Sequence, residues 1–326
     1  MNDEALNDMA PNDVARNRKT STALPRLRIG IDLGGTKIAA IAFDRDERVV
    51  FETRVPTPRH DYEGVIAAIA ALVRKAEQAG GASAGEASVG IGTPGSVSPA
   101  TGRMQNANST WLNDRPFRED LERALGRAIR MENDANCLAL SEAHDGAAKG
   151  ARGVFGVILG TGVGGGLIFD GRVITGHNAI GGEWGHNPLP WPKFGEMPGP
   201  ACWCGRRGCI ETFLSGPALE GEHLRITRRP LKAADIAAGT ASGDKECTAT
   251  LQRYTDRLAR ALAHVVNIFD PEVIVLGGGL SNIMQLYEVL PGLMRPWIFA
   301  AEPRIDIRAP KHGDASGVRG AARLWP

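Results

Sequence analysis

The chain has 326 residues, which is enough for two domains that each bury a core. Hydrophobic residues make up 43% and charged residues 23%, a composition typical of globular proteins in water. The formal net charge of +1 gives no general attraction to nucleic acid or to an anionic membrane. No apolar run approaches the roughly 20 residues that span a bilayer, and the polar residues 1–25 lack a signal-peptide core. We expect a cytoplasmic protein with no nucleic-acid or membrane partner, and a disordered lead-in at residues 1–25.

The ordered chain is expected to begin with three strands. The apolar run 27–33 predicts a buried strand, and the turn Gly34-Gly35-Thr36 separates it from a second strand at 38–43. A charged turn then leads to a third strand near 49–55. The elements expected next are an amphipathic helix around 65–73, a strand at 87–92, a helix around 117–125 that Asp114 caps and Gly126 ends, a strand at 128–132 and a helix from Ala135.

The second half of the chain repeats this plan. A strand at 154–159 meets the glycine-rich turn 160–166, and a strand at 166–169 leads through Asp170-Gly171, a strong hairpin signal, to a strand at 172–175. A duplicated α/β unit of this kind has mixed sheets and leaves a cleft between its two lobes, where ligands commonly bind. The later elements are a helix through 251–265, a strand at 272–276, a helix after Gly279, a strand at 304–308 and a helix from Ser316.

Two glycine turns at corresponding points of a duplicated unit indicate a phosphate-binding role. Glycine lets backbone N–H groups point at an anion because no Cβ stands in the way. Neither turn fits the Walker pattern or the dinucleotide fingerprint, because a strand follows each turn where those motifs need a helix. Ordinary hairpin turns are the alternative interpretation.

We expect the two turns to clasp nucleotide phosphates, with Asp32 facing a phosphate-bound Mg²⁺. A third glycine cluster, which follows the strand at 272–276, would let adenine and ribose approach the backbone. Lys37 is counted with the phosphate-binding residues, although a solvated strand position is the alternative. The predicted nucleotide site comprises Asp32, Gly34, Gly35, Thr36, Lys37, Gly160, Thr161, Gly162, Gly277, Gly278 and Gly279.

Seven segments, in chain order, resemble the motifs of the ROK family, which groups bacterial sugar kinases with sugar-responsive repressors. They span nearly the whole chain after residue 26. The runs GVILGTGVGGG, GEWGHNPLP and GCIETFLSG look most like the fructokinase (mannofructokinase) branch of that family. The seven segments are DLGGTK (32–37), GTPG (92–95), ENDAN (132–136), LGTGVGGG (159–166), GGEWGH (181–186), CWCGRRGCIE (202–211) and LGGG (276–279).

The resemblance implies a duplicated, actin-like or hexokinase-type (ribonuclease H-like) α/β fold with an interdomain cleft. It implies ATP and Mg²⁺ as cosubstrates, a hexose bound between the lobes, and a homodimer. The N-terminal lobe would comprise residues 26–133 joined by the C-terminal helix at about 311–326, and the C-terminal lobe residues 134–310. Carried onto this sequence, Asp134 would be the general base, and sugar hydroxyls would be held by Asn108, Asn133, Glu183, His186 and Glu211.

Carboxylates suit these roles. A sugar hydroxyl is a poor nucleophile at neutral pH, and a nearby carboxylate can accept its proton as the bond to phosphorus forms. Asp134 lies where a strand gives way to a helix, so we expect the helix N-terminus to favour its ionised form; capping that helix is the alternative role. Glu183 and Glu211 suit a polyol because each carboxylate can accept from two adjacent hydroxyls, although surface carboxylates are the alternative.

A histidine and three cysteines in the loop 183–211 offer one imidazole and three thiolates, a closed tetrahedral set for a structural Zn²⁺. These residues are His186, Cys202, Cys204 and Cys209. Glycines between the cysteines allow the tight turn that their spacing requires. The Pro-rich loop has little helix or strand signal, so we expect the metal to order it. Free thiols are the alternative, and the remaining cysteines, Cys137 and Cys247, are interpreted as packing residues.

The sequence therefore predicts an ATP-dependent hexose kinase, most similar to a fructokinase that phosphorylates the 6-hydroxyl. One alternative within the family is a kinase of glucose, mannose or an N-acetylhexosamine. A repressor would need a helix-turn-helix ahead of the sugar domain, and the polar residues 1–25 show no amphipathic helix pair. A non-catalytic sugar sensor is the third alternative.

Overall fold

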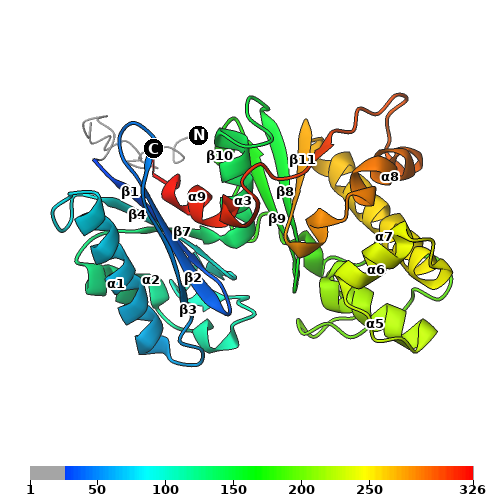
Figure 1. Ribbon diagram of the computed structural model, residues 1–326, viewed down its shortest axis with the longest axis horizontal. Coiled ribbons are helices and arrows are strands. Elements are labelled where there is room, and N and C mark those ends of the chain that lie inside the picture. The colour runs from blue at the N-terminus through cyan, green and yellow to red at the C-terminus, as the bar shows by residue number, and fades with distance from the viewer. Residues whose placement is uncertain (1–25, 326) are drawn as a thin grey trace, which may run out of the picture.

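The computed structural model describes residues 26–325, so the lead-in predicted at 1–25 lies outside the described residues. Two five-stranded sheets share one strand order, β3-β2-β1-β4-β7 in the first lobe and β10-β9-β8-β11-β12 in the second. Figure 1 shows the two sheets side by side, each with helices on its outer side. The predicted duplication is confirmed, because each sheet consists of three antiparallel strands followed by two strands in parallel pairing.

The first lobe is held together by an apolar core between its sheet and helix α1 (Tyr62–Ala79). Asp61 caps this helix by accepting a hydrogen bond from the Gly64 amide at 2.9 Å. The other elements of the lobe are β1 (Arg28–Leu33), β2 (Lys37–Phe43), β3 (Val49–Pro56), β4 (Ser88–Thr93), β7 (Arg130–Asn133), the small pair β5 (Ser96–Val97) and β6 (Met104–Gln105), and α2 (Phe117–Leu125).

One capping prediction is wrong in this lobe. Pro116 occupies the N-cap of α2 without a side-chain hydrogen bond, and Asp114 lies outside the helix. Asp114 adopts a positive φ of 60°, and its amide donates to the Met104 carbonyl at 2.9 Å. Its backbone is therefore committed to the preceding loop. Gly126 ends the helix in the left-handed conformation, as predicted.

The second lobe packs its sheet against long helix α7 (Lys245–Phe269), whose buried residues include Leu251, Tyr254 and Leu258. Strand β9 begins at Val163, so the glycine turn is shorter than predicted and covers only 160–162. The other elements are α3 (Asp134–His144), β8 (Gly153–Leu159), β9 (Val163–Phe169), β10 (Arg172–Val173), α4 (Glu211–Leu214), α5 (Gly216–Thr227), α6 (Ala233–Ala241), β11 (Val273–Gly277), α8 (Gln285–Met294) and β12 (Ile307–Arg308).

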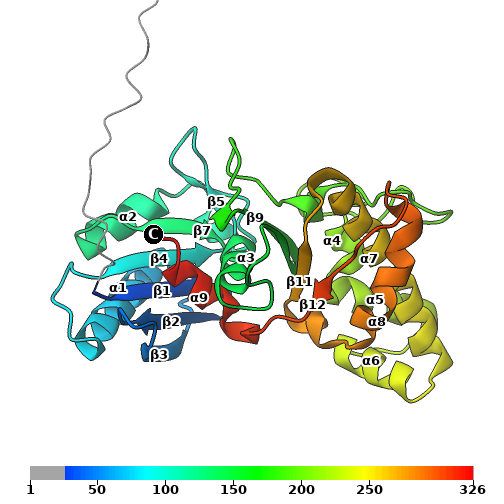
Figure 2. The same cartoon turned by 90° about the horizontal axis from the view of Figure 1, so that it is seen from above.

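The last helix, α9 (Ser316–Ala322), returns the chain to the first lobe. It packs on β1 and β4 and against α3, and Figures 1 and 2 both show α9 and α3 between the two sheets. Glycines make this close approach possible: a Cβ on Gly90 would collide with the Ala321 carbonyl, and a Cβ on Gly320 with the Cys137 carbonyl. In the part of the chain from 26 to 325, no helix combines the length and apolar character that a membrane span requires.

Candidate active site

The carboxyl ends of the parallel strands meet at one edge of each sheet. In the first sheet, Asp32 pairs with Gly92, and Thr93 pairs with Asn133. A cavity of about 240 Å³ is lined by residues that follow these ends and by the β8–β9 hairpin of the second sheet. The site therefore lies between the lobes, at the strand ends where α/β sheets commonly bind ligands.

The cavity brings together every residue predicted to hold the sugar or to act as base. These are Asn108, Asn133, Asp134, Glu183, His186 and Glu211. Of the predicted nucleotide residues, Thr161 and Gly162 line the same cavity. The others lie outside this cavity, with exposed turns at Gly35–Lys37 and Gly278–Gly279.

Asp134 is fixed by the junction between β7 and α3. Asn133 caps the helix through a 2.8 Å hydrogen bond from the Ala135 amide, and Asp134 Oδ1 accepts from the same amide at 2.8 Å. Burial raises the pKa of Asp134 to about 6 even though this hydrogen bond lowers it. The backbone amides at the helix N-terminus thus favour the ionised form, as expected, and burial outweighs them in the net shift.

Asp32 lies at the end of β1, in a space that two glycines leave open. A Cβ added to Gly317 of α9 would lie 3.0 Å from Asp32 Oδ2, and one added to Gly92 of β4 would lie 3.6 Å from Oδ1. Burial and, after it, the charge of Asp134 raise the pKa of Asp32 to about 7, while the charges of Lys37 and Arg54 lower it. The Asp134 carboxylate is thus near enough to disfavour the ionised form of Asp32.

Two glutamates complete an acidic wall of the cavity. Burial, followed by the charges of Asp134 and Glu211, raises the pKa of Glu183. Glu211 begins α4, and its Oε2 accepts a hydrogen bond from the Val163 amide at 2.9 Å. Its Oε1 accepts from the Trp203 indole Nε1 at 2.7 Å. Glu211 therefore joins the glycine hairpin to the cysteine-rich loop.

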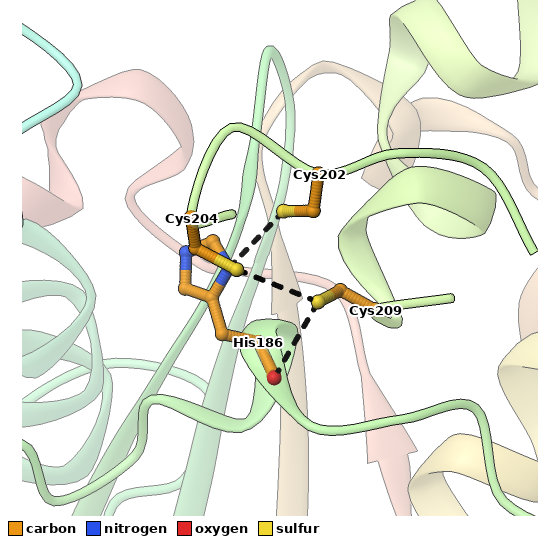
Figure 3. A group of neighbouring side chains, drawn as sticks. All are labelled: His186, Cys202, Cys204 and Cys209. Carbon is orange, nitrogen blue, oxygen red and sulfur yellow. Dashed lines mark hydrogen bonds between the residues drawn. The ribbon is translucent and has the colours of Figure 1, made fainter. Parts of the chain in front are cut away.

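The predicted metal ligands converge, as Figure 3 shows. One ligand atom from each of His186, Cys202, Cys204 and Cys209 lies within 4.8 Å of the others. Cys202 Sγ lies 3.5 Å from His186 Nδ1, and Cys204 Sγ lies 3.6 Å from Cys209 Sγ. These spacings fit a tetrahedral Zn²⁺, whose Zn–S bonds of about 2.3 Å place two sulfurs about 3.8 Å apart.

The backbone around this cluster has the geometry that the spacing of the cysteines requires. Gly205 and Gly208 have positive φ angles of 86° and 69°, so the tight turn predicted between the cysteines is present. Cys137 and Cys247 are buried in apolar clusters, as predicted for packing residues.

Sequence reasoning missed several residues of the cavity wall. Trp203 lines the cavity and lies between two cysteines of the metal motif, whose last residue is Glu211. That place in the motif was the sequence signal that could have identified it. Asn106 also lines it, with a positive φ of 59°. Trp184, by contrast, is buried against Phe155, and its Nε1 donates to the Gly164 carbonyl at 2.9 Å, so it packs rather than lining the cavity.

Comparison with known proteins decides the family, because the model of the ROK family matches residues 28–326. The chain belongs to the ROK family. N-acetyl-D-glucosamine kinases of Shigella flexneri and Escherichia coli are 44% identical to it over 303 residues, covering 90% of this chain and 98% of theirs.

Solved structures agree with this assignment. The ROK hexokinase of Thermus thermophilus superposes with a TM-score of 0.79 at 36% identity, covering 91% of this chain and 96% of that one. A ROK glucokinase of Streptomyces griseus, solved with glucose and AMPPNP, has a TM-score of 0.74 at 28% identity and coverages of 91% and 98%. The two-lobed hexokinase-type fold and the prediction of a ROK sugar kinase are thereby confirmed. These relatives support neither the fructokinase branch nor the repressor alternative.

Proposed function

We propose that this chain is an ATP-dependent kinase of N-acetylhexosamines, with N-acetyl-D-glucosamine as its preferred substrate and the 6-hydroxyl as acceptor. The observation that supports this proposal most strongly is the 44% identity to N-acetyl-D-glucosamine kinases across 98% of their length. The glucokinase of Streptomyces griseus is only 28% identical. Similarity over the whole chain outweighs the three short runs that suggested fructose.

The cavity chemistry supports a polyol that carries an amide. Glu183, Glu211 and His186 provide acceptors and a donor for hydroxyl groups, which is the set that sugar recognition needs. Asn106 and Asn108 add side-chain amides to the wall. A side-chain amide can donate to the acetamido carbonyl and accept from its N–H, so it complements this substituent on both sides.

Asp134 would act as the general base. Bound Mg-ATP supplies the phosphoryl group, and the Asp134 carboxylate takes the proton from the attacking hydroxyl. With a pKa of about 6, this carboxylate is ionised at neutral pH and is more basic than an ordinary aspartate. Such a base contributes about 10²- to 10⁴-fold to the rate.

The glycine turns and Asp32 would hold the nucleotide and its metal. The exposed turn at Gly35–Lys37 begins three residues after Asp32, and the turn at 160–162 carries Thr161 into the cavity wall. A carboxylate beside phosphate-binding turns suits Mg²⁺, which prefers one or two carboxylates together with phosphate oxygens. Bound Mg²⁺ would also stabilise the ionised form of Asp32 against its burial.

His186, Cys202, Cys204 and Cys209 would hold a structural Zn²⁺. Four protein ligands close the tetrahedron, so the metal has no open position for catalysis. Nδ1 of His186 faces Cys202, while the same ring lines the cavity, so the second ring nitrogen is available to a sugar hydroxyl. The metal would thereby orient a sugar-binding residue.

The test is ADP release by zinc-loaded protein with Mg-ATP and a panel of sugars. The panel holds N-acetylglucosamine, N-acetylmannosamine, glucose, mannose and fructose. We expect the highest kcat/KM for N-acetylglucosamine, at least about tenfold above glucose, which corresponds to about 1.4 kcal/mol of transition-state discrimination. A higher kcat/KM for glucose or fructose would overturn the substrate assignment, and no ADP release with any sugar would overturn the kinase.

A further inference from the structure

Trp203 occupies an unusual position for a tryptophan. It stands between the ligands Cys202 and Cys204, and 54% of its surface is exposed, whereas Trp184 in the neighbouring core is only 5% exposed. A side chain so exposed contributes little to an apolar core. Trp203 instead lines the cavity, so its role is to be sought there.

Trp203 contacts two of the residues assigned to the sugar. Its indole Nε1–H donates to Glu211 Oε1 at 2.7 Å, a short hydrogen bond to a charged acceptor. Its ring meets the His186 imidazole edge to face, with centroids 4.9 Å apart and planes at 90°. One side chain thus touches both a metal ligand and a carboxylate of the cavity.

Two different segments fix the Glu211 carboxylate. Oε1 is held by Trp203 from the metal loop, and Oε2 is held by the Val163 amide, directly after the glycine turn. The carboxylate also lies against Gly162, where an added Cβ would be 2.6 Å from Oε2. Without the indole donor, one oxygen would lose its partner in a cavity that already holds the charges of Asp134 and Glu183.

We propose that Trp203 is a positioning residue for sugar recognition, holding Glu211 and the His186 ring in place and connecting the metal cluster to the cavity. The inference rests on the proposed function only in taking a sugar as the ligand. Trp203 acts through Glu211, because its single polar atom is committed to that carboxylate. The sugar then meets a carboxylate whose oxygens are already in place, which lowers the entropic cost of binding.

The experiment replaces Trp203 by Phe, which keeps an aromatic ring and removes the N–H donor. A hydrogen bond to a charged group is worth a factor of about 10 to 100, so we expect the KM for N-acetylglucosamine to rise by that factor. The KM for ATP and the zinc content should stay at wild-type values. Trp191→Phe is the matched control, because Trp191 is 42% exposed in the same loop but stacks on Trp297 at 5.2 Å.

A double-mutant cycle with Glu211→Gln separates positioning from a merely structural role. If Trp203 acts through Glu211, the double variant has the same sugar KM as Glu211→Gln alone. If instead the sugar KM of the double variant rises by the product of the two single-variant factors, the proposal is overturned. An unchanged sugar KM in Trp203→Phe would overturn it as well. Loss of zinc from Trp203→Phe would also overturn it, since the tryptophan would then hold the loop rather than the carboxylate.

The same four proteins keep this test independent of the substrate assignment. Their urea unfolding, in zinc-loaded protein without sugar, measures the coupling between Trp203 and Glu211 directly. We expect the two substitutions to be non-additive in this measurement, and additivity would overturn the proposal. If no sugar in the panel is bound or phosphorylated while the unfolding cycle still shows coupling, the proposed function fails and the Trp203–Glu211 link stands.

Discussion

Two regions of the molecule form the cavity, and they hold their side chains by different means. Asp134 lies at a strand-to-helix junction, where the register of β7 with β4 and the Asn133 cap fix the backbone. Glu183 and His186 lie instead in the loop 183–211. Besides short helical turns, that loop has only the isolated bridges Pro188–Cys209 and Ala201–Arg207 among the described residues.

This difference separates chemistry from recognition. The junction needs no ligand to hold its shape, because backbone hydrogen bonds and the packing of α3 against α9 supply it. The loop is anchored to α7 where Arg260 donates to the Pro190 and Trp191 carbonyls and binds Glu196. Its part next to the cavity would depend in addition on the four proposed metal ligands, which converge at one point. We therefore expect loss of the Asp134 carboxylate to stop phosphoryl transfer and spare sugar binding, and damage at the loop to do the reverse.

The largest effect is expected from Asp134→Asn. Removing the base should lower kcat about 10²- to 10⁴-fold while the sugar KM stays within about threefold, because asparagine keeps the shape and loses the basicity. Steady-state ADP release measures both constants. Asp145→Asn is the control, because Asp145 ends the same helix and pairs with Arg319 and His312. A fall in kcat below tenfold would argue against the base assignment.

Removal of the proposed metal from the loop 183–211 should change the sugar KM rather than kcat. Cys204→Ser, or chelation of the wild type, should raise the sugar KM by about 10- to 100-fold, because an oriented metal ligand is lost from the cavity wall. The measurement is zinc content alongside kinetics, with Cys247→Ala as a control thiol outside the cluster. Unchanged turnover in demonstrably zinc-free protein would show that the loop holds its shape without metal.

The dependence of kcat on pH tests the assignment of Asp134 as the base, independently of the loop 183–211. Because the pKa of Asp134 is raised to about 6, its carboxylate is protonated below that pH and cannot accept a proton. We expect kcat to fall about tenfold for each pH unit below 6 and to level off above pH 7. Circular dichroism at each pH checks that the protein stays folded. A flat profile between pH 5 and 7 would contradict the assignment.

The smallest effect concerns stability. The folded-state pKa of Asp134 is raised from 3.8 to about 6, so its burial destabilises the fold above pH 6, and this penalty fades as pH falls toward 4. Asp134→Asn removes the penalty and should raise the free energy of unfolding at pH 8 by on the order of 2 kcal/mol in nucleotide-free protein. Thermal unfolding at pH 8 and pH 4 measures it. Equal differences at both pH values would exclude this origin.

Much of the architecture could be predicted from the sequence. Apolar runs such as 27–33 and 154–159 become buried strands β1 and β8, and the glycine turns after them stand at equivalent places in the two sheets. Asp134 enters the cavity because it directly follows β7, whose carboxyl end lies at the cleft. The local sequence pattern is therefore sufficient to predict a site residue where the adjoining strand or helix positions its side chain.

The remainder depends on contacts between distant segments. The raised pKa of Asp32 requires α9 to lie against β1 with Gly317 beside the carboxylate, about 285 residues away in sequence by their numbering. In the sequence, Trp203 is simply the residue between two cysteines. Only the folded loop places its indole N–H within hydrogen-bonding distance of Glu211. Asp114 failed as a cap because its backbone pairs with Met104, which the local capping pattern does not reveal.

The most direct test of the division between chemistry and recognition is calorimetric binding of N-acetylglucosamine to Asp134→Asn and to Cys204→Ser. We expect Asp134→Asn to bind the sugar within about threefold of wild type while releasing almost no ADP. We expect Cys204→Ser to bind the sugar about 10- to 100-fold more weakly. Loss of sugar binding in Asp134→Asn, or wild-type binding in Cys204→Ser, would contradict this division.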